Sequence, residues 1–86
     1  MWIIELTFTS ELERMLARAA HRDRLTALHG EGTVRMAGPL ADDSGALIII
    51  DAPDHQTATT ILAADPYFTT PGVTVARIRE WNPFLR

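Results

Sequence analysis

The sequence contains no cysteine and no lysine among its 86 residues. Without cysteine there is no disulfide framework, no thiolate nucleophile and no cysteine-ligated metal site. No apolar run approaches membrane-spanning length, and the first residues lack the basic segment and long apolar stretch of a signal peptide, so we expect a cytoplasmic protein with no membrane partner. The formal net charge of -3 argues against nucleic-acid binding, because a phosphate backbone favours clustered cations.

All of the positive side-chain charge outside histidine comes from arginines that are spread along the chain and mostly interleaved with acids. Such a pattern is more often a solvated surface than a binding patch. The composition, with 47% hydrophobic and 22% charged residues, is a globular balance. The length suits one hydrophobic core and not two, so we predict a single domain over residues 1–86.

Residues 33–51 are the centre of the predicted fold, as two strands joined by a polar turn. The apolar, β-branched stretch 46–50 predicts a strand that is covered on both faces, in the middle of a sheet. In the turn, Gly45 is expected to supply a positive φ. Pro39 is expected to close the first strand, since proline cannot donate to a ladder, and Gly38 leaves bare backbone beside it. That bare backbone is a natural place for a ligand.

A first strand over residues 2–8 is predicted by apolar residues that alternate with Glu5 and Thr7. Ser10 and Glu13 follow with the spacing of a capping box, in which each side chain bonds the other residue's backbone N–H. The spacing predicts that a helix begins here.

The apolar residues of this helix form two stripes that one straight helix cannot bury against one sheet. The first stripe comprises Leu12, Met15, Leu16 and Ala19, and the second comprises His21, Leu25 and Leu28. We therefore predict a short entry turn, a bend at residues 18–20 and a main helix to about His29. His21 is expected on the buried side of that main helix.

A second helix is predicted after Asp54, which has the residue type and position of an N-cap. Its core stripe is Ala58, Ile61 and Leu62, and the next position on that stripe is Asp65. Pro66 forces Asp65 out of helical geometry, so its carboxylate is expected at a helix C-terminus, where the helix dipole disfavours negative charge. Asp65 therefore needs a compensating partner.

Three further residues could line a pocket, and each has a simpler reading. Tyr67, in the loop after the second helix, and Trp81, at the end of a last strand over residues 73–81, could wall a pocket or belong to the core. Ser44 could be a donor in the cleft or a turn serine. The alternation of the last strand leaves its buried face undecided.

No metal or cofactor is predicted. The sequence has no P-loop, nucleophile elbow or dinucleotide fingerprint, which argues against nucleotide-driven chemistry. His29 and His55 are expected on the surface, and the histidine spacings give no reason for a metal site.

The order of the predicted elements is βαββαβ, which indicates an α+β, ferredoxin-like fold with two helices on one face of a four-stranded antiparallel sheet. The other sheet face is left uncovered, and the stretch 46–50 would expose an apolar patch there. We predict a homodimer in which a second copy covers this face about a two-fold axis.

The sequence resembles the YciI-like, or YCII-related, domain family. The resemblance is carried by residues 18–21 (Arg-Ala-Ala-His) with Leu25 and Leu28, by 30–32 (Gly-Glu-Gly) leading to 37–40 (Ala-Gly-Pro-Leu), by 64–67 (Ala-Asp-Pro-Tyr), and by Trp81. These segments cover most of the chain in the order of the family. The resemblance implies a ferredoxin-like fold that forms a dimeric α/β barrel similar to muconolactone isomerase. The sequence departs from the family at Ala19 and Ala20, where many members have proline just before the main helix.

The resemblance also implies a site. Family members carry a histidine and an aspartate in a cleft, matched here by His21 and Asp65, which would act as an acid/base pair. One branch of the family contains a dehydrochlorinase of a chlorinated hydroquinone, which favours elimination or isomerisation of a small cyclic substrate without a cofactor. The expected substrate contacts are Gly38, Pro39, Ser44, Tyr67 and Trp81.

Two other interpretations stay open. His21 and Asp65 could form a buried structural ion pair that ties the two helices together. The protein would then be a non-catalytic homodimeric module that binds a metabolite or a partner protein.

Overall fold

The computed structural model describes residues 1–9 and 11–86. Its elements are β1 (Trp2–Phe8), α1 (Leu12–Gly30), β2 (Val34–Pro39), β3 (Gly45–Ile50), α2 (His55–Ala63), the short 3₁₀ helix η1 (Pro66–Thr69) and β4 (Val73–Glu80). The predicted capping residue Ser10 lies outside the described residues.

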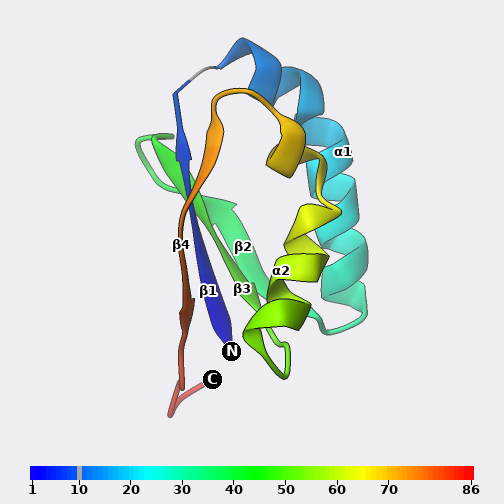
Figure 1. The fold of residues 1–86 in the computed structure, drawn as a ribbon, viewed down its shortest axis with the longest axis vertical. Helices are drawn as coiled ribbons and strands as arrows, with labels where there is room; N and C mark the ends of the chain where they lie inside the picture. Colours follow the sequence, from blue (N-terminus) through cyan, green and yellow to red (C-terminus); the bar gives the residue numbers. More distant parts are fainter. Residues whose placement is uncertain (10) are drawn as a thin grey trace.

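The strands form one antiparallel sheet in the order β2-β3-β1-β4, with α1 and α2 on the same face (Figure 1). The predicted ferredoxin-like α+β fold is therefore confirmed. The two strands of the hairpin were predicted in the middle of the sheet. This is confirmed for β3, which is an interior strand, and wrong for β2, which is an edge strand. The edge position explains how β2 accommodates Pro39, which has no N–H to donate.

The core lies between the sheet and the helices. Ile4 on β1 and Ile48 and Ile50 on β3 are at most 2% exposed and face the helices. Successive side chains on a strand point to opposite faces, so Leu47, which is 36% exposed, belongs to the other face. Within this chain β3 is thus covered on one face only, and not on both as the sequence suggested.

A register shift explains why the sequence did not identify the buried face of β4. The pairing of β1 with β4 shifts between Glu5 and Leu6. The shift inserts one extra residue into β4, so Val75 and Ile78, three positions apart, both pack against the core. Strict alternation cannot place two such residues on one face.

Helix α1 is continuous from Leu12 to Gly30, so the predicted entry turn, separated from a main helix by a bend, is wrong. The bend was required only if both apolar stripes had to be buried, and the first stripe is not buried: Leu12 is 71% exposed and Leu16 is 76% exposed. The face that α1 turns toward the sheet is a straight stripe at intervals of three and four residues. It consists of Arg14, Arg18, His21, Leu25 and Leu28.

The hairpin turn between β2 and β3 also differs from the prediction. The residue with positive φ is Asp43, at 59°, and not Gly45. Aspartate tolerates this left-handed conformation better than most residues. Gly45 is required for space instead, because a Cβ at this position would overlap the backbone carbonyl of Leu6 on the neighbouring strand.

Helix α2 begins as predicted, with Asp54 as its N-cap. The carboxylate of Asp54 accepts a hydrogen bond from the backbone N–H of Thr57 at 2.8 Å. Hydrogen bonding from the side chain and the backbone of Thr57 lowers the pKa of Asp54, because it favours the ionised carboxyl. Within residues 1–9 and 11–86, no helix is long and apolar enough to cross a lipid bilayer.

Candidate functional site

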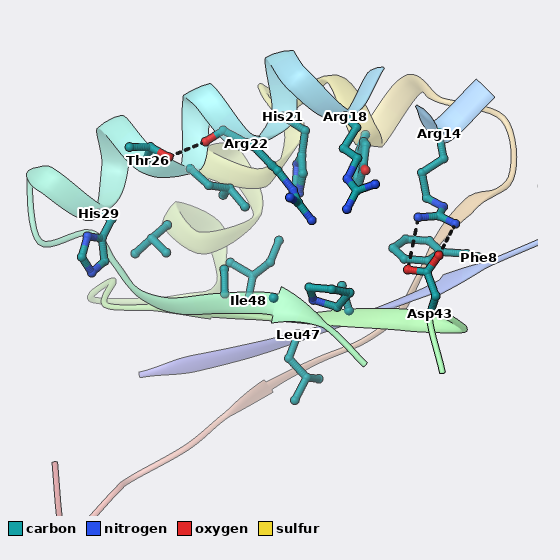
Figure 2. A pocket seen from close by; sticks show the side chains of 17 residues that line it. Phe8, Arg14, Arg18, His21, Arg22, Thr26, His29, Asp43, Leu47 and Ile48 are labelled. Carbon is teal, nitrogen blue, oxygen red and sulfur yellow. Dashed lines mark hydrogen bonds and ion pairs between the residues drawn. The ribbon is translucent and has the colours of Figure 1, made fainter. Parts of the chain in front are cut away.

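A cavity of about 450 Å³ lies between α1 and the half of the sheet formed by β2 and β3 (Figure 2). Its volume falls within the range of pockets that hold small molecules, roughly 300 to 1,000 Å³. One wall is polar and comes from α1, and the floor is apolar and comes from the strands. The polar side chains of α1 at the cavity are Arg14, Arg18, His21, Arg22, Thr26 and His29.

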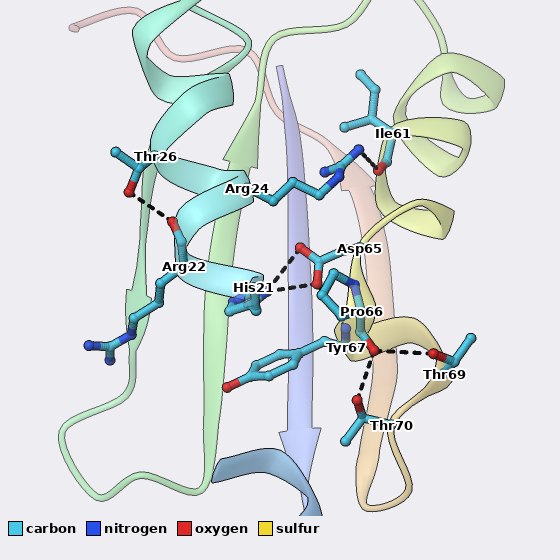
Figure 3. A network of polar contacts seen from close by, with 10 residues as sticks. All are labelled: His21, Arg22, Arg24, Thr26, Ile61, Asp65, Pro66, Tyr67, Thr69 and Thr70. Atoms are coloured by element: carbon cyan, nitrogen blue, oxygen red, sulfur yellow. Dashed lines mark hydrogen bonds and ion pairs between the residues drawn. The ribbon is translucent and has the colours of Figure 1, made fainter. Parts of the chain in front are cut away.

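His21 and Asp65 form a buried pair beside this cavity (Figure 3). Nδ1 of His21 lies 2.8 Å from Oδ1 and 2.9 Å from Oδ2 of Asp65. The two residues are 6% and 3% exposed, and they come from α1 and from the segment between α2 and η1. The tertiary structure thus brings together two residues that are 44 positions apart in the sequence.

Asp65 lies just beyond the C-terminus of α2, at the start of η1. Helix α2 ends at Ala63, and Asp65 has an extended backbone, with φ −81° and ψ 135°. Its carboxylate caps η1 by accepting the backbone N–H of Tyr67 at 2.8 Å. The predicted departure from helical geometry is therefore confirmed, and the compensating partners of the carboxylate are a backbone amide and His21.

Tyr67 fixes the plane of the His21 ring. The two rings are stacked, with centroids 3.7 Å apart and an interplanar angle of 6°. Tyr67 is 4% exposed, and its ring forms a T-shaped pair with the ring of Phe8 at a centroid distance of 6.1 Å. The imidazole is thus held by Asp65 at one nitrogen and by Tyr67 across its face.

This arrangement determines which nitrogen of His21 is available. An ionised carboxylate can only accept hydrogen bonds, so beside Asp65 it is Nδ1 that carries the proton. In the neutral ring the lone pair is then on Nε2. Nε2 has no hydrogen-bond partner within residues 1–9 and 11–86, and His21 lines the cavity.

Three arginines of α1 line the cavity in addition, and the sequence analysis placed them on a solvated surface. Arg14 is 5% exposed; its Nη2 pairs with Oδ2 of Asp43 at 3.0 Å, and its guanidinium lies 4.2 Å from the centroid of the Phe8 ring. Arg18 and Arg22 have no carboxylate partner in the part of the chain that the structure describes. The signal that could have identified these arginines is their spacing of four residues, which puts positions 14 and 18 on the His21 side of the helix and position 22 at the edge of that side.

Three of the five predicted substrate contacts lie at the cavity. Gly38 and Pro39 border it from the end of β2, and Tyr67 borders it from η1. Their positions agree with the predicted pocket, and they stay candidates for substrate contact.

The other two predicted contacts lie elsewhere. The hydroxyl of Ser44 donates to Oδ1 of Asp42 at 2.6 Å in the exposed hairpin turn, which lowers the pKa of Asp42. Trp81 follows β4, is 43% exposed and does not line the cavity. Ser44 is therefore a turn serine, and we do not propose either residue as a substrate contact.

The remaining histidines give no metal site. His29 is exposed and borders the far end of the cavity, and His55 lies edge-on to the ring of Trp2 at 5.5 Å. Among the described residues, no three side chains of histidine, cysteine, aspartate or glutamate are grouped closely enough to hold a metal ion.

Comparison with known proteins yields three findings. Residues 2–82 match the family described as YCII-related domain. The uncharacterised protein YjpA of Bacillus subtilis (strain 168) is 31% identical over 77 residues, which cover 90% of this chain and 89% of YjpA. The structure of 5-chloro-2-hydroxyhydroquinone dehydrochlorinase from Burkholderia phenoliruptrix AC1100, in complex with 2,5-dihydroxybenzoquinone, matches with a TM-score of 0.68 over 95% of this chain and 94% of that chain. At 18% identity, this last match establishes a shared fold and nothing about activity.

Proposed function

Because this chain belongs to the YCII-related domain family, we propose that it is a small cofactor-free enzyme in which His21 transfers a proton and Asp65 orients His21. The observation that carries the proposal is the contact of Nδ1 of His21 with both carboxylate oxygens of Asp65, at 2.8 and 2.9 Å, in a histidine that lines the cavity. A carboxylate at one imidazole nitrogen fixes the tautomer and makes the other nitrogen a better base.

The reaction class that suits this arrangement is elimination or isomerisation of a small ring compound. Nε2 of His21 takes a proton from a C–H or O–H group of the substrate, and the electron pair left behind forms a new double bond. In an elimination, a leaving group such as chloride departs with its bonding electrons. In an isomerisation, the imidazolium returns the proton to a different carbon. Neither course needs an oxidant or a reductant.

Two features support a small cyclic substrate. The cavity volume of about 450 Å³ suits one ring with a few substituents, and the floor of the cavity is apolar. The dehydrochlorinase that shares this fold was solved with 2,5-dihydroxybenzoquinone, a ring of this size. Gly38, Pro39 and Tyr67 would form the walls nearest to it.

The test is proton exchange and turnover with a panel of hydroxylated and chlorinated rings that includes 5-chloro-2-hydroxyhydroquinone. Chloride release reports elimination, and uptake of deuterium from D₂O into recovered substrate or product reports proton abstraction. The key variant is His21→Asn, whose side-chain amide can still donate to Asp65 but has nothing in place of Nε2. We expect a loss of roughly 10²- to 10⁴-fold in rate, the usual contribution of a general base. The control is His29→Asn, because His29 borders the same cavity and has no carboxylate partner among the described residues.

The alternative function is a non-catalytic binding module. The specific observation in its favour is that the His21–Asp65 pair is almost completely buried and joins α1 to the start of η1, as a structural pair would. Activity in His21→Asn equal to that of wild type, or no deuterium uptake into any compound of the panel, would favour this alternative.

We further propose that the protein is a homodimer through the open sheet face. The pairing register puts Met36, Ile49 and Ile3 in one row across that face, and Met36 is 72% exposed. A second copy would cover this row about a two-fold axis. Sedimentation analysis should give a dimer for wild type and a monomer for Ile49→Glu, whereas a monomeric wild type would contradict the proposal.

A further inference from the structure

The positive charge of the cavity is not balanced by its own walls. Arg14, Arg18 and Arg22 line the cavity, and Asp43 is the only carboxylate that does so among the described residues. Asp43 is already paired with Arg14. The chain as a whole carries a formal net charge of -3, so this concentration of cations runs against the overall charge of the protein.

Arg14 and the other two arginines differ in what holds them. Arg14 is buried, pairs with Asp43 and lies over the ring of Phe8, so its guanidinium is fixed as part of the wall. Arg18 contacts the sulfur of Met15 at 3.4 Å, which supplies no charge. Figure 2 shows the side chains of Arg18 and Arg22 leaving α1 on the side of the cavity, near His21.

We propose that the ligand of this cavity is a small organic anion, a planar ring that carries a carboxylate or enolate, and that Arg18 and Arg22 bind its negative group. This inference rests on the proposed function only for its consequence in catalysis, since anion binding itself needs no reaction. Arginine suits the role because its planar fork donates two parallel hydrogen bonds to a carboxylate. The apolar floor would take the face of the ring.

The positions of the charges also fit the chemistry proposed for His21. Removal of a proton by a neutral base leaves negative charge on the substrate. The guanidinium groups of Arg18, one helical turn before His21, and of Arg22, the residue that follows His21, are placed to stabilise that charge. An anionic ligand would thus be recognised by the same groups that stabilise the product of proton abstraction.

The direct test compares benzoate with benzamide, which have almost the same shape and differ in charge. We would titrate each compound into the isotope-labelled protein and follow the backbone amide signals of α1 and β3 by NMR. The expected result is that benzoate binds at least about tenfold more tightly than benzamide, as the loss of a charge-assisted hydrogen bond implies. Benzoate affinity should fall between about 0.05 M and 0.5 M salt, because added ions screen the attraction.

The matched variants are Arg18→Gln, Arg22→Gln and Arg86→Gln. All three remove one positive charge, but Arg86 is exposed at the end of the chain and does not line the cavity. We expect each of the first two to weaken benzoate binding by about tenfold and to leave benzamide binding unchanged, with Arg86→Gln like wild type. Arg18 and Arg22 lie outside the hydrophobic core, so both variants are expected to fold.

Several outcomes would overturn the inference. These are equal binding of the two probes, no binding of benzoate up to about 20 mM, and equal benzoate affinity in the three variants. The inference is also separable from the proposed function through His21→Asn. If His21→Asn still binds benzoate and wild type turns over no compound, the anion site is retained and the proposed enzyme is rejected. If wild type turns over a substrate but binds benzoate and benzamide equally, the enzyme is retained and the anion site is rejected.

Discussion

Replacing Asp65 with asparagine keeps the shape of the side chain but removes its charge and one acceptor oxygen. In the native protein, Oδ1 accepts from both the backbone N–H of Tyr67 and Nδ1 of His21, each at 2.8 Å. If the asparagine oxygen keeps the bond to Tyr67, its NH₂ group faces His21. The NH₂ group then stands in the place of Oδ2, 2.9 Å from Nδ1, where its N–H opposes a proton on Nδ1. We therefore expect Nδ1 to become an acceptor and the imidazole proton to move to Nε2.

This tautomer change predicts the functional result. With its proton on Nε2, the neutral ring no longer presents a lone pair to the cavity, so Asp65→Asn is expected to lose roughly 10²- to 10⁴-fold in rate. Two-dimensional ¹⁵N NMR of the imidazole distinguishes the two tautomers directly. We expect neutral His21 to carry its proton on Nδ1 in wild type and on Nε2 in the variant.

The effect on the free energy of unfolding should depend on the substitution. Asparagine still accepts one hydrogen bond and exchanges a charged partner for a neutral one, which costs about 1 kcal/mol. Alanine leaves the N–H of Tyr67 and Nδ1 of His21 without a partner at a site that is 3% exposed, so we expect a loss of about 3 to 5 kcal/mol. For a domain of this size, Tm falls by about 4 to 8 °C for each kcal/mol.

Urea and thermal unfolding of both variants provide the assay, with Asp51→Ala as the control. The carboxylate of Asp51 is about half exposed and makes only a long contact with Arg35, at 3.8 Å, so its loss should cost less than about 1 kcal/mol. If Asp65→Ala unfolds like Asp51→Ala, or if His21 in Asp65→Asn keeps its proton on Nδ1, the reasoning is refuted.

Three further predictions concern the fold. Leu62→Ala removes a core side chain that is 2% exposed and should reduce the free energy of unfolding by about 2 to 5 kcal/mol in a urea titration; a loss below about 1 kcal/mol would show that the core is loosely packed here. Gly45→Ala should reduce the free energy of unfolding by about 1 to 3 kcal/mol, because its Cβ would overlap the neighbouring strand. Gly30→Ala, whose Cβ would have nothing within 4 Å among the described residues, should be neutral or stabilising. Equal effects of the two substitutions would contradict the packing argument. The pKa of Asp54 is lower in the folded protein than in the unfolded chain, because the ionised carboxylate accepts a hydrogen bond from Thr57. This bond therefore stabilises the protein fully at pH above the unfolded-state pKa, and the stabilisation is lost as the pH falls through the folded-state pKa. The stability difference between wild type and Asp54→Ala should therefore shrink on acidification, and a difference that grew at low pH would reverse the sign of the argument.

Local interactions made much of the fold predictable. The alternation in β1, the N-cap at Asp54 and the closing of β2 at Pro39 depend on neighbours within a few positions, and the structure confirms each of them. The order of these elements then indicated the ferredoxin-like fold. Family membership was predicted from the spacing of short segments and is also confirmed.

The features that the sequence analysis missed depend on contacts across the sheet or across the cavity. The register shift opposite Glu5 decides which residues of β4 are buried. His21, Leu25 and Leu28 mark the buried side of α1 as predicted, but the buried side of its first half was misjudged because the apolar residues there were assumed to mark it. That side carries Arg14 and Arg18, since it faces a cavity with room for polar groups.

The sequence by itself determined the elements, their order and the family of this protein, because hydrophobic period, capping and turn chemistry act over a few residues. Only the tertiary structure decided what surrounds Asp65. The carboxylate accepts from a backbone amide two residues away and from His21, 44 positions distant, and no local rule fixes the second contact. The same holds for Arg18 and Arg22: their spacing is in the sequence, but their place at the cavity, with no carboxylate partner among the described residues, is decided only when the sheet is packed beneath α1.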